Sequence, residues 1–294
     1  MAKRGRTGFI IAFLSPAVLL YGVFVVWPLI QAFYQSLFRW KGVSSTKTFV
    51  GLDNFARLGS DEGFHKALWN NLAILVVGGF AIIVLSLLLA HAMQSNNVFV
   101  RALRGLYLFP QVVSLVVVAI VWQFMYNPSI GLLTKGAEIV GVKGVGQPLA
   151  DSSQALAAVG IAFVWYAVGF YIMLFSAGLK QIPEEVNEAA ELDGSSGWHR
   201  FWKVTWPMLW SVKRIATIYI VINVLNIFAL VWVMTEGGPN RATETLLTLL
   251  YKSAFKDSEF GYGTTVAVAN FAIAMLLAAI LMFVYRKNPE ERRT

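Results

Sequence analysis

Long apolar stretches dominate the hydrophobic pattern of the chain. Six of them contain no Asp, Glu, Lys or Arg and run for twenty or more residues. An α-helix rises about 1.5 Å per residue, so about 20 residues cross a hydrocarbon layer about 30 Å thick. Because the backbone must satisfy its own hydrogen bonds in lipid, each stretch is predicted to be one membrane-spanning helix. The predicted spans are Phe9–Phe38, Leu68–Gln94, Gly105–Tyr126, Gln154–Leu179, Ile215–Thr235 and Gly263–Tyr285.

The first apolar stretch also follows a basic N-terminus, as a signal peptide does. A signal peptide has an apolar region of only about 7–15 residues, followed by small residues at the cleavage site. This stretch continues to Phe38 and carries the bulky Trp27 and Phe33. We therefore expect a retained first helix. Because it is long and contains Pro16 and Pro28, we expect it to tilt or kink, or its ends to lie in the membrane interface.

Composition supports a membrane protein and excludes several kinds of chemistry. The chain has 294 residues, of which 14% are charged, against about a quarter in soluble domains. It has no cysteine, so disulfides, thiolate metal sites and cysteine nucleophiles are excluded. Its three histidines lie far apart in the sequence, and it lacks the G-x-x-x-x-G-K-[ST] loop that binds ATP. We predict an all-α integral membrane protein without a catalytic site, a metal site or a cofactor of its own.

The distribution of Lys and Arg predicts the topology. With a cytoplasmic N-terminus, the inward-facing segments 1–8, 95–104, 180–214 and 286–294 hold fourteen basic residues over 62 positions. The outward-facing segments 39–67, 127–153 and 236–262 hold ten over 83 positions. Cytoplasmic loops are enriched in Lys and Arg, so both termini are predicted to be cytoplasmic. Topology then explains most of the net charge of +8, and nucleic acid is not an expected partner.

The spans carry neutral polar side chains in place of charges. Ion-coupled transporters usually hold charged groups at membrane depth, so energy for transport would come from another subunit. Asn223 and Asn226 are three residues apart in the fifth span and share a helix face. The fourth span carries aromatic residues at Tyr166, Phe170 and Tyr171. These residues have two possible roles: interhelical hydrogen bonding and packing, or a pocket for a neutral polyhydroxylated ligand.

One acidic segment, EEVNEAAELDGSS, contrasts with the apolar chain. Pro183 suits the first turn of a helix, and acids at Glu184 and Glu185 suit the same positive end. Gly194 suits the left-handed position that ends a helix. The segment is therefore predicted to be a short hydrated helix over Pro183–Asp193, followed by a second amphipathic piece at Gly197–Thr205.

At this segment the sequence resembles the "EAA" loop of binding-protein-dependent ABC importer permeases of the maltose and glycerol-phosphate type. The pattern is I-P-x-x-x-x-E-A-A-x-x-D-G-A-x-x-x-x-x-F-x-x-[IV]-x-x-P-x-L, and Ser195 departs from it where Ala is usual. Further segments resemble the family at Phe49–Phe55, Phe109–Leu133, Met234–Leu246 and Phe260–Val268. The matching positions in the loop are Ile182, Pro183, Glu188, Ala189, Ala190, Asp193, Gly194, Phe201, Val204, Pro207 and Leu209.

The resemblance implies a type I ABC importer permease fold in a bacterial or archaeal cytoplasmic membrane. Residues 1–67 would form the N-terminal tail, first helix and outer loop. Residues 68–285 would form a five-helix core with the EAA loop at 180–207, and 286–294 a cytoplasmic tail. The chain would form half of a sugar pathway, and its partners would be a second permease, an ATPase dimer, an extracytoplasmic sugar-binding protein and membrane lipid.

The resemblance also implies two sets of functional residues. The EAA helix would dock in an ATPase subunit through Glu188, Ala189, Ala190, Asp193 and Gly194. Substrate contacts would come from Tyr166, Ala167, Phe170, Ile220, Asn223, Val224 and Ile227. The last four have the spacing of one helix face. A permease for another neutral or phosphorylated polyol, and a secondary transporter, are the alternatives; no catalytic motif favours an enzyme.

Overall fold

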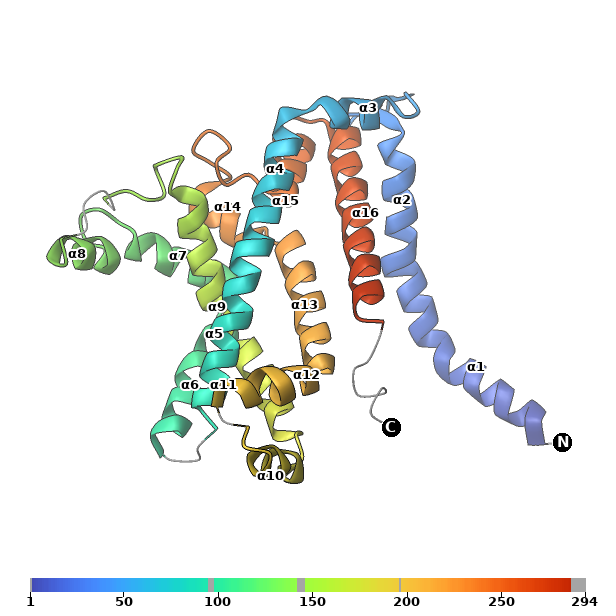
Figure 1. The fold of residues 1–294 in the computed structure, drawn as a ribbon. Helices are drawn as coiled ribbons and strands as arrows, with labels where there is room; N and C mark the ends of the chain where they lie inside the picture. The colour runs from blue at the N-terminus through green and yellow to red at the C-terminus, as the bar shows by residue number, and fades with distance from the viewer. Residues whose placement is uncertain (1, 95–97, 142–145, 196, 287–294) are drawn as a thin grey trace. The chain divides into compact units, whose positions relative to one another are not determined.

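The computed structural model describes residues 2–94, 98–141, 146–195 and 197–286, which divide into two compact units. The first unit contains the chain up to Phe64 together with Leu249–Phe271. The second contains His65–Thr248 and the chain from Ala272. Most of the predicted tail at 286–294 lies outside the described residues. Figure 1 labels the helices and strands of both units.

The first unit is formed by the N-terminal helices, the first loop and a late part of the chain. A short antiparallel hairpin, with Phe38 opposite Phe49, adds the described strands to a fold that was predicted to be all-α. The elements are α1 (Ala2–Tyr21), η1 (a π-helical turn at Gly22–Val26), α2 (Trp27–Ser36), β1 (Phe38–Trp40), β2 (Lys47–Phe49), α3 (Asp53–Ser60), the start of α4 (Glu62–Ala73), the end of α15 (Leu246–Tyr251), η4 (Lys252–Lys256) and the start of α16 (Phe260–Val284).

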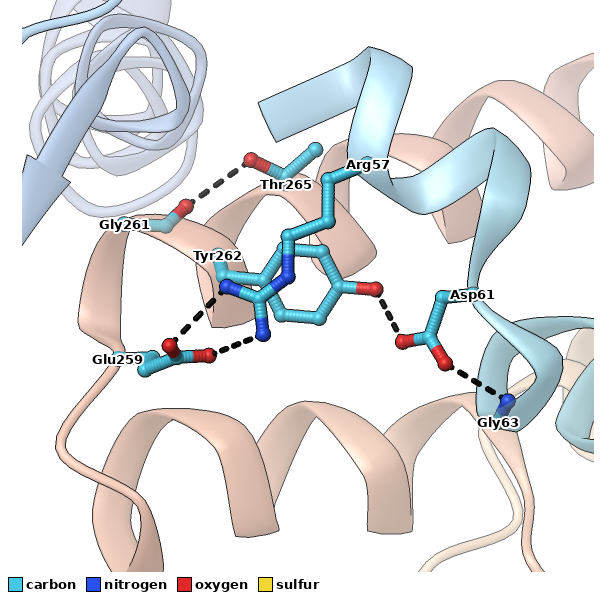
Figure 2. A network of polar contacts seen from close by, with 7 residues as sticks. All are labelled: Arg57, Asp61, Gly63, Glu259, Gly261, Tyr262 and Thr265. Atoms are coloured by element: carbon cyan, nitrogen blue, oxygen red, sulfur yellow. Dashed lines mark hydrogen bonds and ion pairs between the residues drawn. The ribbon is translucent and has the colours of Figure 1, made fainter. Parts of the chain in front are cut away.

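A polar network holds α3 against the start of α16 in the first unit (Figure 2). The guanidinium of Arg57 donates to both carboxylate oxygens of Glu259 at 3.0 and 2.7 Å. It also lies 4.3 Å from the ring centroid of Tyr262, whose hydroxyl donates to Asp61. The hydrogen bond with Glu259 raises the pKa of Arg57. A half-exposed ion pair contributes at most about 1 kcal/mol, so the network fixes orientation more than it adds stability.

The second unit is a helical bundle around α9 (Ala155–Lys180). Helix α5 packs along it, and α6, α7, α13 and α14 also contact it. Its buried side chains include Phe163, Tyr171, Ile172 and Phe175. The other elements are the end of α4, η2 (Ile74–Gly78), α5 (Gly79–Ala92), α6 (Val98–Val112), α7 (Leu115–Met125), α8 (Leu132–Ile139), α10 (Glu184–Leu192), α11 (Gly197–Arg200), η3 (Phe201–Thr205), α12 (Trp206–Met208), α13 (Trp210–Leu225) and α14 (Ala229–Thr235).

Four of the predicted spans are single long helices. They are Phe9–Ser36, Glu62–Ala92, Ala155–Lys180 and Phe260–Val284. The third predicted span is instead two helices that meet at 111°, Gly105–Val112 and Leu115–Met125. Pro110 has no N–H for the helix ladder, and Ser114 has ψ 135°, outside the helical region. The prediction of one uninterrupted helix over Gly105–Tyr126 was therefore wrong.

The fifth predicted span is also broken. Helix α13 already begins at Trp210 and ends at Leu225, and the chain from Asn226 to Phe228 is not helical before α14 begins. The apolar helix that could cross a membrane here is a pair bent by 72°, Gly197–Met208 and Trp210–Leu225. The described residues thus contain four candidate spans, or up to six when each bent pair counts as one.

Amide side chains provide hydrogen bonds at these helix ends. Buried Asn71 donates to the carbonyl of Val224 at 2.8 Å and accepts from the N–H of Leu246 at 2.9 Å. Gln123 on α7 donates to the carbonyl of Val233 at 2.7 Å. The hydroxyl of Thr245 donates to the carbonyl of Ile227, which lies in the break after α13. Because lipid provides no hydrogen bonds, a broken helix at membrane depth needs partners of this kind.

Two glycines of α9 differ in what surrounds them. A Cβ at Gly169 would overlap the carbonyl oxygen of Tyr107 on α6, so the close approach of α6 and α9 requires glycine there. A Cβ at Gly160 would meet no atom within 4 Å. Both residues are helical, so their intrinsic preference for alanine is the same.

We expect Gly169→Ala to lower stability by roughly 1–3 kcal/mol, the usual cost of overpacking, because α6 must move away from α9. Gly160→Ala should be neutral or should stabilise the protein by up to about 1 kcal/mol, the helix preference of alanine over glycine. Thermal unfolding of the purified variants in one detergent measures both. Equal unfolding temperatures for the two variants would contradict the close α6–α9 contact.

Candidate functional site

Helix α10 forms as the acidic segment predicts, with small differences at its ends. Pro183 occupies the N-cap position, and Glu184 and Glu185 lie in the first turn. Gly194 has φ +72°, in the left-handed region. The N–H of Ser195 donates to the carbonyl of Ala190 at 2.9 Å, and that of Gly194 to Glu191 at 3.0 Å. This paired arrangement ends a helix by satisfying its last carbonyls, and it requires a residue that tolerates positive φ.

The predicted coupling residues present one exposed surface with a single buried exception. Glu188, Ala189, Asp193 and Gly194 are exposed, whereas Ala190 is 7% exposed. Ala190 faces the core and leaves the opposite side of the short helix to solvent or to another protein. Four of the five predicted coupling residues are therefore accessible on the chain itself.

An aromatic helix follows α10 directly. It runs from Gly197 through α11 and η3 to Met208. Its ring contacts join Trp198, Phe201, Trp202 and Trp206. Trp198 is 74% exposed, so the described residues leave part of this apolar surface uncovered. The guanidinium of Arg200 pairs with Glu191 and ties the aromatic helix to the end of α10.

The structure does not bring the seven predicted substrate residues onto one surface. Phe170 and Asn223 are exposed, and Tyr166 is half-buried. The other four are buried in the core of the second unit: Ala167, Ile220, Val224 and Ile227. Ile227 lies beyond the end of α13, so the expectation that it shares a helix face with Ile220 was wrong. Whether any of the seven contacts substrate stays a prediction.

The accessible members of this set belong to a small aromatic and amide cluster between α9 and α13. The ring of Phe170 lies 5.6 Å from that of Tyr219 and 5.2 Å from that of Tyr171. The amide of Asn223 donates to the hydroxyl of Tyr171 at 3.4 Å. The interhelical hydrogen bond considered for Asn223 is therefore present, whereas Asn226 donates to its own helix at Ile222.

Tyr219 takes part in this cluster although the sequence pattern did not single it out, whereas Tyr171 was considered there as an aromatic residue of a possible pocket. Tyr219 precedes Asn223 by four residues, which places both on one side of α13. That spacing was available in the sequence. The partner of Tyr219 on α9 was not, because only the packing of the two helices places Phe170 beside it.

Two hollows lie among the described residues of the second unit outside the aromatic and amide cluster. One is a polar cavity of ≈ 390 Å³ between the ends of α5 and α9 and the segments around α10 and η3. The other is an apolar groove of ≈ 710 Å³ along α5 and α9. The described residues hold no group of three His, Asp or Glu residues that could bind a metal ion.

Comparisons with known proteins decide the family. A family described as "Binding-protein-dependent transport system inner membrane component" matches residues 82–292, which is more than half of the chain. The chain belongs to this family. The permease is 32% identical to the diacetylchitobiose uptake system permease protein NgcF of Streptomyces coelicolor, over 96% of this chain and 83% of that protein. It is 31% identical to the sn-glycerol-3-phosphate transport system permease protein UgpA of Agrobacterium fabrum, over 90% of each.

The permease also shares its fold with a solved structure. It is 19% identical to a chain of a bacterial ABC transporter that imports the acidic polysaccharide alginate, with a TM-score of 0.80 and 96% of each chain covered. These findings confirm the predicted family, of the carbohydrate-importer type, and the all-helical membrane fold. The chain is a multi-pass inner-membrane subunit, and ATP hydrolysis takes place in a separate ATPase. Permeases of this family carry no cofactor.

We expect Gly194→Val to open the end of α10, because a β-branched residue at φ +72° costs about 1–3 kcal/mol. Gly194→Asn should retain the end of the helix, since Asn tolerates this conformation. Hydrogen exchange of the Gly194–Ser195 amides measures the change, with faster exchange expected in the Val variant only. Unchanged exchange in the Val variant would show that the left-handed glycine does not hold the helix end.

Proposed function

We propose that the permease forms half of a sugar import pathway and receives the ATP-driven movement through α10. The observation that carries this proposal is the exposed acidic surface of α10, which ends at a fixed left-handed glycine. A hydrated helix of nine residues contributes little to a membrane core. It does present charges and small side chains where another protein can approach closely.

The proposed coupling requires α10 to lie in the cytoplasm. The Lys and Arg asymmetry supports this orientation, since the segment 180–214 that contains α10 holds five basic residues. Both termini then lie on the same side as α10. We assign the cytoplasmic ATPase dimer to the surface of α10, and the extracytoplasmic binding protein to the opposite side of the membrane.

The connection from α10 to the rest of the permease is short. Only Gln181–Pro183 separates α10 from α9, the helix at the centre of the second unit. On its other side, the ion pair between Glu191 and Arg200 joins α10 to the aromatic helix that leads to α13. A displacement of α10 would therefore reach α9 and α13, the two helices that carry the aromatic and amide cluster.

We expect Glu188→Lys to reduce ATP-driven uptake by at least severalfold, because it reverses an exposed charge on the proposed docking surface. Glu184→Lys is the matched control, since it makes the same charge change at an exposed position of the same helix. Co-purification of the ATPase with each variant, together with uptake in proteoliposomes, measures the effect. Equal loss in both variants would show that overall acidity matters and that Glu188 has no specific role.

The aromatic and amide cluster is the proposed substrate contact of this chain. The face of an aromatic ring such as Phe170 or Tyr219 can cover the apolar face of a sugar ring. The amide of Asn223 can donate to and accept from hydroxyl groups. The cluster is accessible without unfolding the core, whereas Ile220, Val224 and Ile227 would contact substrate only after the helices rearrange.

A neutral sugar is the favoured substrate class. The six apolar stretches contain no Asp, Glu, Lys or Arg, so a charged solute would have no counter-charge from them in a low-dielectric pathway. The similarity to a diacetylchitobiose uptake permease supports this class. The similarity to a glycerol-3-phosphate permease supports a phosphorylated polyol as the second candidate. A second permease subunit could supply the cation that such a solute needs.

We expect Asn223→Leu to reduce sugar uptake severalfold or more, because one lost hydrogen bond alone costs about 0.5–1.5 kcal/mol. Phe170→Ala should also reduce uptake, because it removes the ring that would cover the apolar face of the sugar. Asn226→Leu is the control, since the amide of Asn226 bonds to its own helix. The readouts are uptake across a panel of neutral sugars and glycerol 3-phosphate, and ATPase activity stimulated by the binding protein. Wild-type behaviour of both test variants would place the substrate contacts elsewhere.

A further inference from the structure

The proposed function assigns no role to the polar cavity beside α10. Its volume of ≈ 390 Å³ falls within the range of small-molecule sites, about 300–1,000 Å³. Its lining combines His91 from the end of α5, Lys180 from the end of α9, and Arg200 from the aromatic helix. The described residues that line it include no Asp or Glu. The cavity therefore concentrates groups that attract anions.

The basic side chains remain able to bind a ligand. Arg200 uses one terminal nitrogen for Glu191, whose side chain is 66% exposed, and a guanidinium has five N–H donors in all. This ion pair positions the guanidinium and leaves donors for a second anion. Lys180 forms no ion pair with any carboxylate in the described part of the chain. The two cations thus keep their capacity for charge-assisted hydrogen bonds.

Neutral donors complete the lining. The hydroxyls of Ser176 and Thr205 and the amide of Asn187 belong to three different segments, α9, η3 and α10. A phosphate group presents several acceptor oxygens to donors of this kind, and Arg clusters recognise it by bidentate hydrogen bonds. A carboxylate has fewer oxygens and would leave more of these donors unused.

The cavity lies between the end of α9 and α10, so a ligand bound in it would contact both helices. Lys180 lies in the last turn of α9, and Asn187 lies on α10, on the two sides of the Gln181–Pro183 connection. An anion bound to both would hold α10 to α9. Because α10 must transmit movement in the proposed function, such a ligand would restrain coupling.

We propose that this cavity binds a phosphate group, carried by a soluble phosphate ester or by an anionic lipid, and that its occupancy restrains α10. The restraint rests on the proposed function, whereas binding of the phosphate does not. A soluble sugar phosphate would link import to the supply of phosphorylated sugar in the cytoplasm. A lipid headgroup would link it to the composition of the membrane.

The binding test uses the complete importer complex with inorganic phosphate and glucose 6-phosphate as soluble probes, and chloride at equal ionic strength as the reference. Titration calorimetry in nanodiscs of phosphatidylcholine measures binding of the two soluble probes, which is the soluble arm of the test. Nanodiscs with phosphatidylglycerol, studied by native mass spectrometry, measure the lipid arm. We expect saturable binding in one arm, at least about tenfold weaker in Lys180→Gln and Arg200→Gln. Lys203→Gln, an exposed neighbour outside the lining, should bind as wild type.

The same variants test the restraint through ATPase activity stimulated by the binding protein. The ligand found in the binding test should lower stimulation in wild type and in Lys203→Gln, and should lower it less in Lys180→Gln. Absence of saturable binding in both arms, or equal weakening in Lys203→Gln, would overturn the site. Binding without any effect on stimulation would overturn the restraint. Loss of stimulation in every sample without ligand would instead contradict the proposed function.

Discussion

Every backbone polar group that leaves a helix at membrane depth must find a partner within the protein, because hydrocarbon offers none. The second unit meets this constraint with a few amide and hydroxyl side chains. The side chain of Asn71 donates to the carbonyl of Val224 at the end of α13 and accepts from the N–H of Leu246 at the start of α15. The hydroxyl of Thr245 donates to the carbonyl of Ile227 in the break itself. The amide of Gln123 on α7 donates to the carbonyl of Val233 on α14. These contacts give partners to backbone groups at the end of α13, in the break after it and in α14.

The breaks decide which side chains remain accessible. If the fifth apolar stretch were one helix, Ile220, Asn223, Val224 and Ile227 would form a continuous face. Because α13 ends at Leu225, the chain turns at Asn226–Phe228 and buries Ile227 in the core. Asn223 stays exposed, and its amide donates to the hydroxyl of Tyr171 on α9. The candidate substrate surface is consequently smaller and more aromatic than a straight helix would provide.

Helix α10 is hydrated, unlike the helices of the bundle, so water can bind those of its backbone groups that lack a partner in the protein. The left-handed end at Gly194 satisfies its last carbonyls, and the carbonyl of Pro183 accepts from the N–H of Val186 at 3.2 Å. The remaining N–H groups of the first turn can bind water, because Glu184 and Glu185 are exposed. The buried Ala190 and the ion pair at Arg200 attach it to the bundle. Ser195, at the position where the family usually has Ala, buries a hydroxyl that has no hydrogen-bond partner among the described residues. An exposed helix attached to a membrane bundle suits contact with a soluble partner.

The sequence by itself determined the class of the protein, the four long spans and the acidic helix. Each of these depends on local properties: the length of an apolar stretch, helix propensity, and a glycine at a left-handed position. It also identified the family, because the EAA pattern is a local run of residues. Only the tertiary structure decided where Gly105–Tyr126 and Ile215–Thr235 break, and which predicted substrate residues are accessible. Those outcomes depend on hydrogen bonds between residues as distant as Asn71 and Leu246, and on the approach of α6 to Gly169, and neither leaves a periodic signal in the chain.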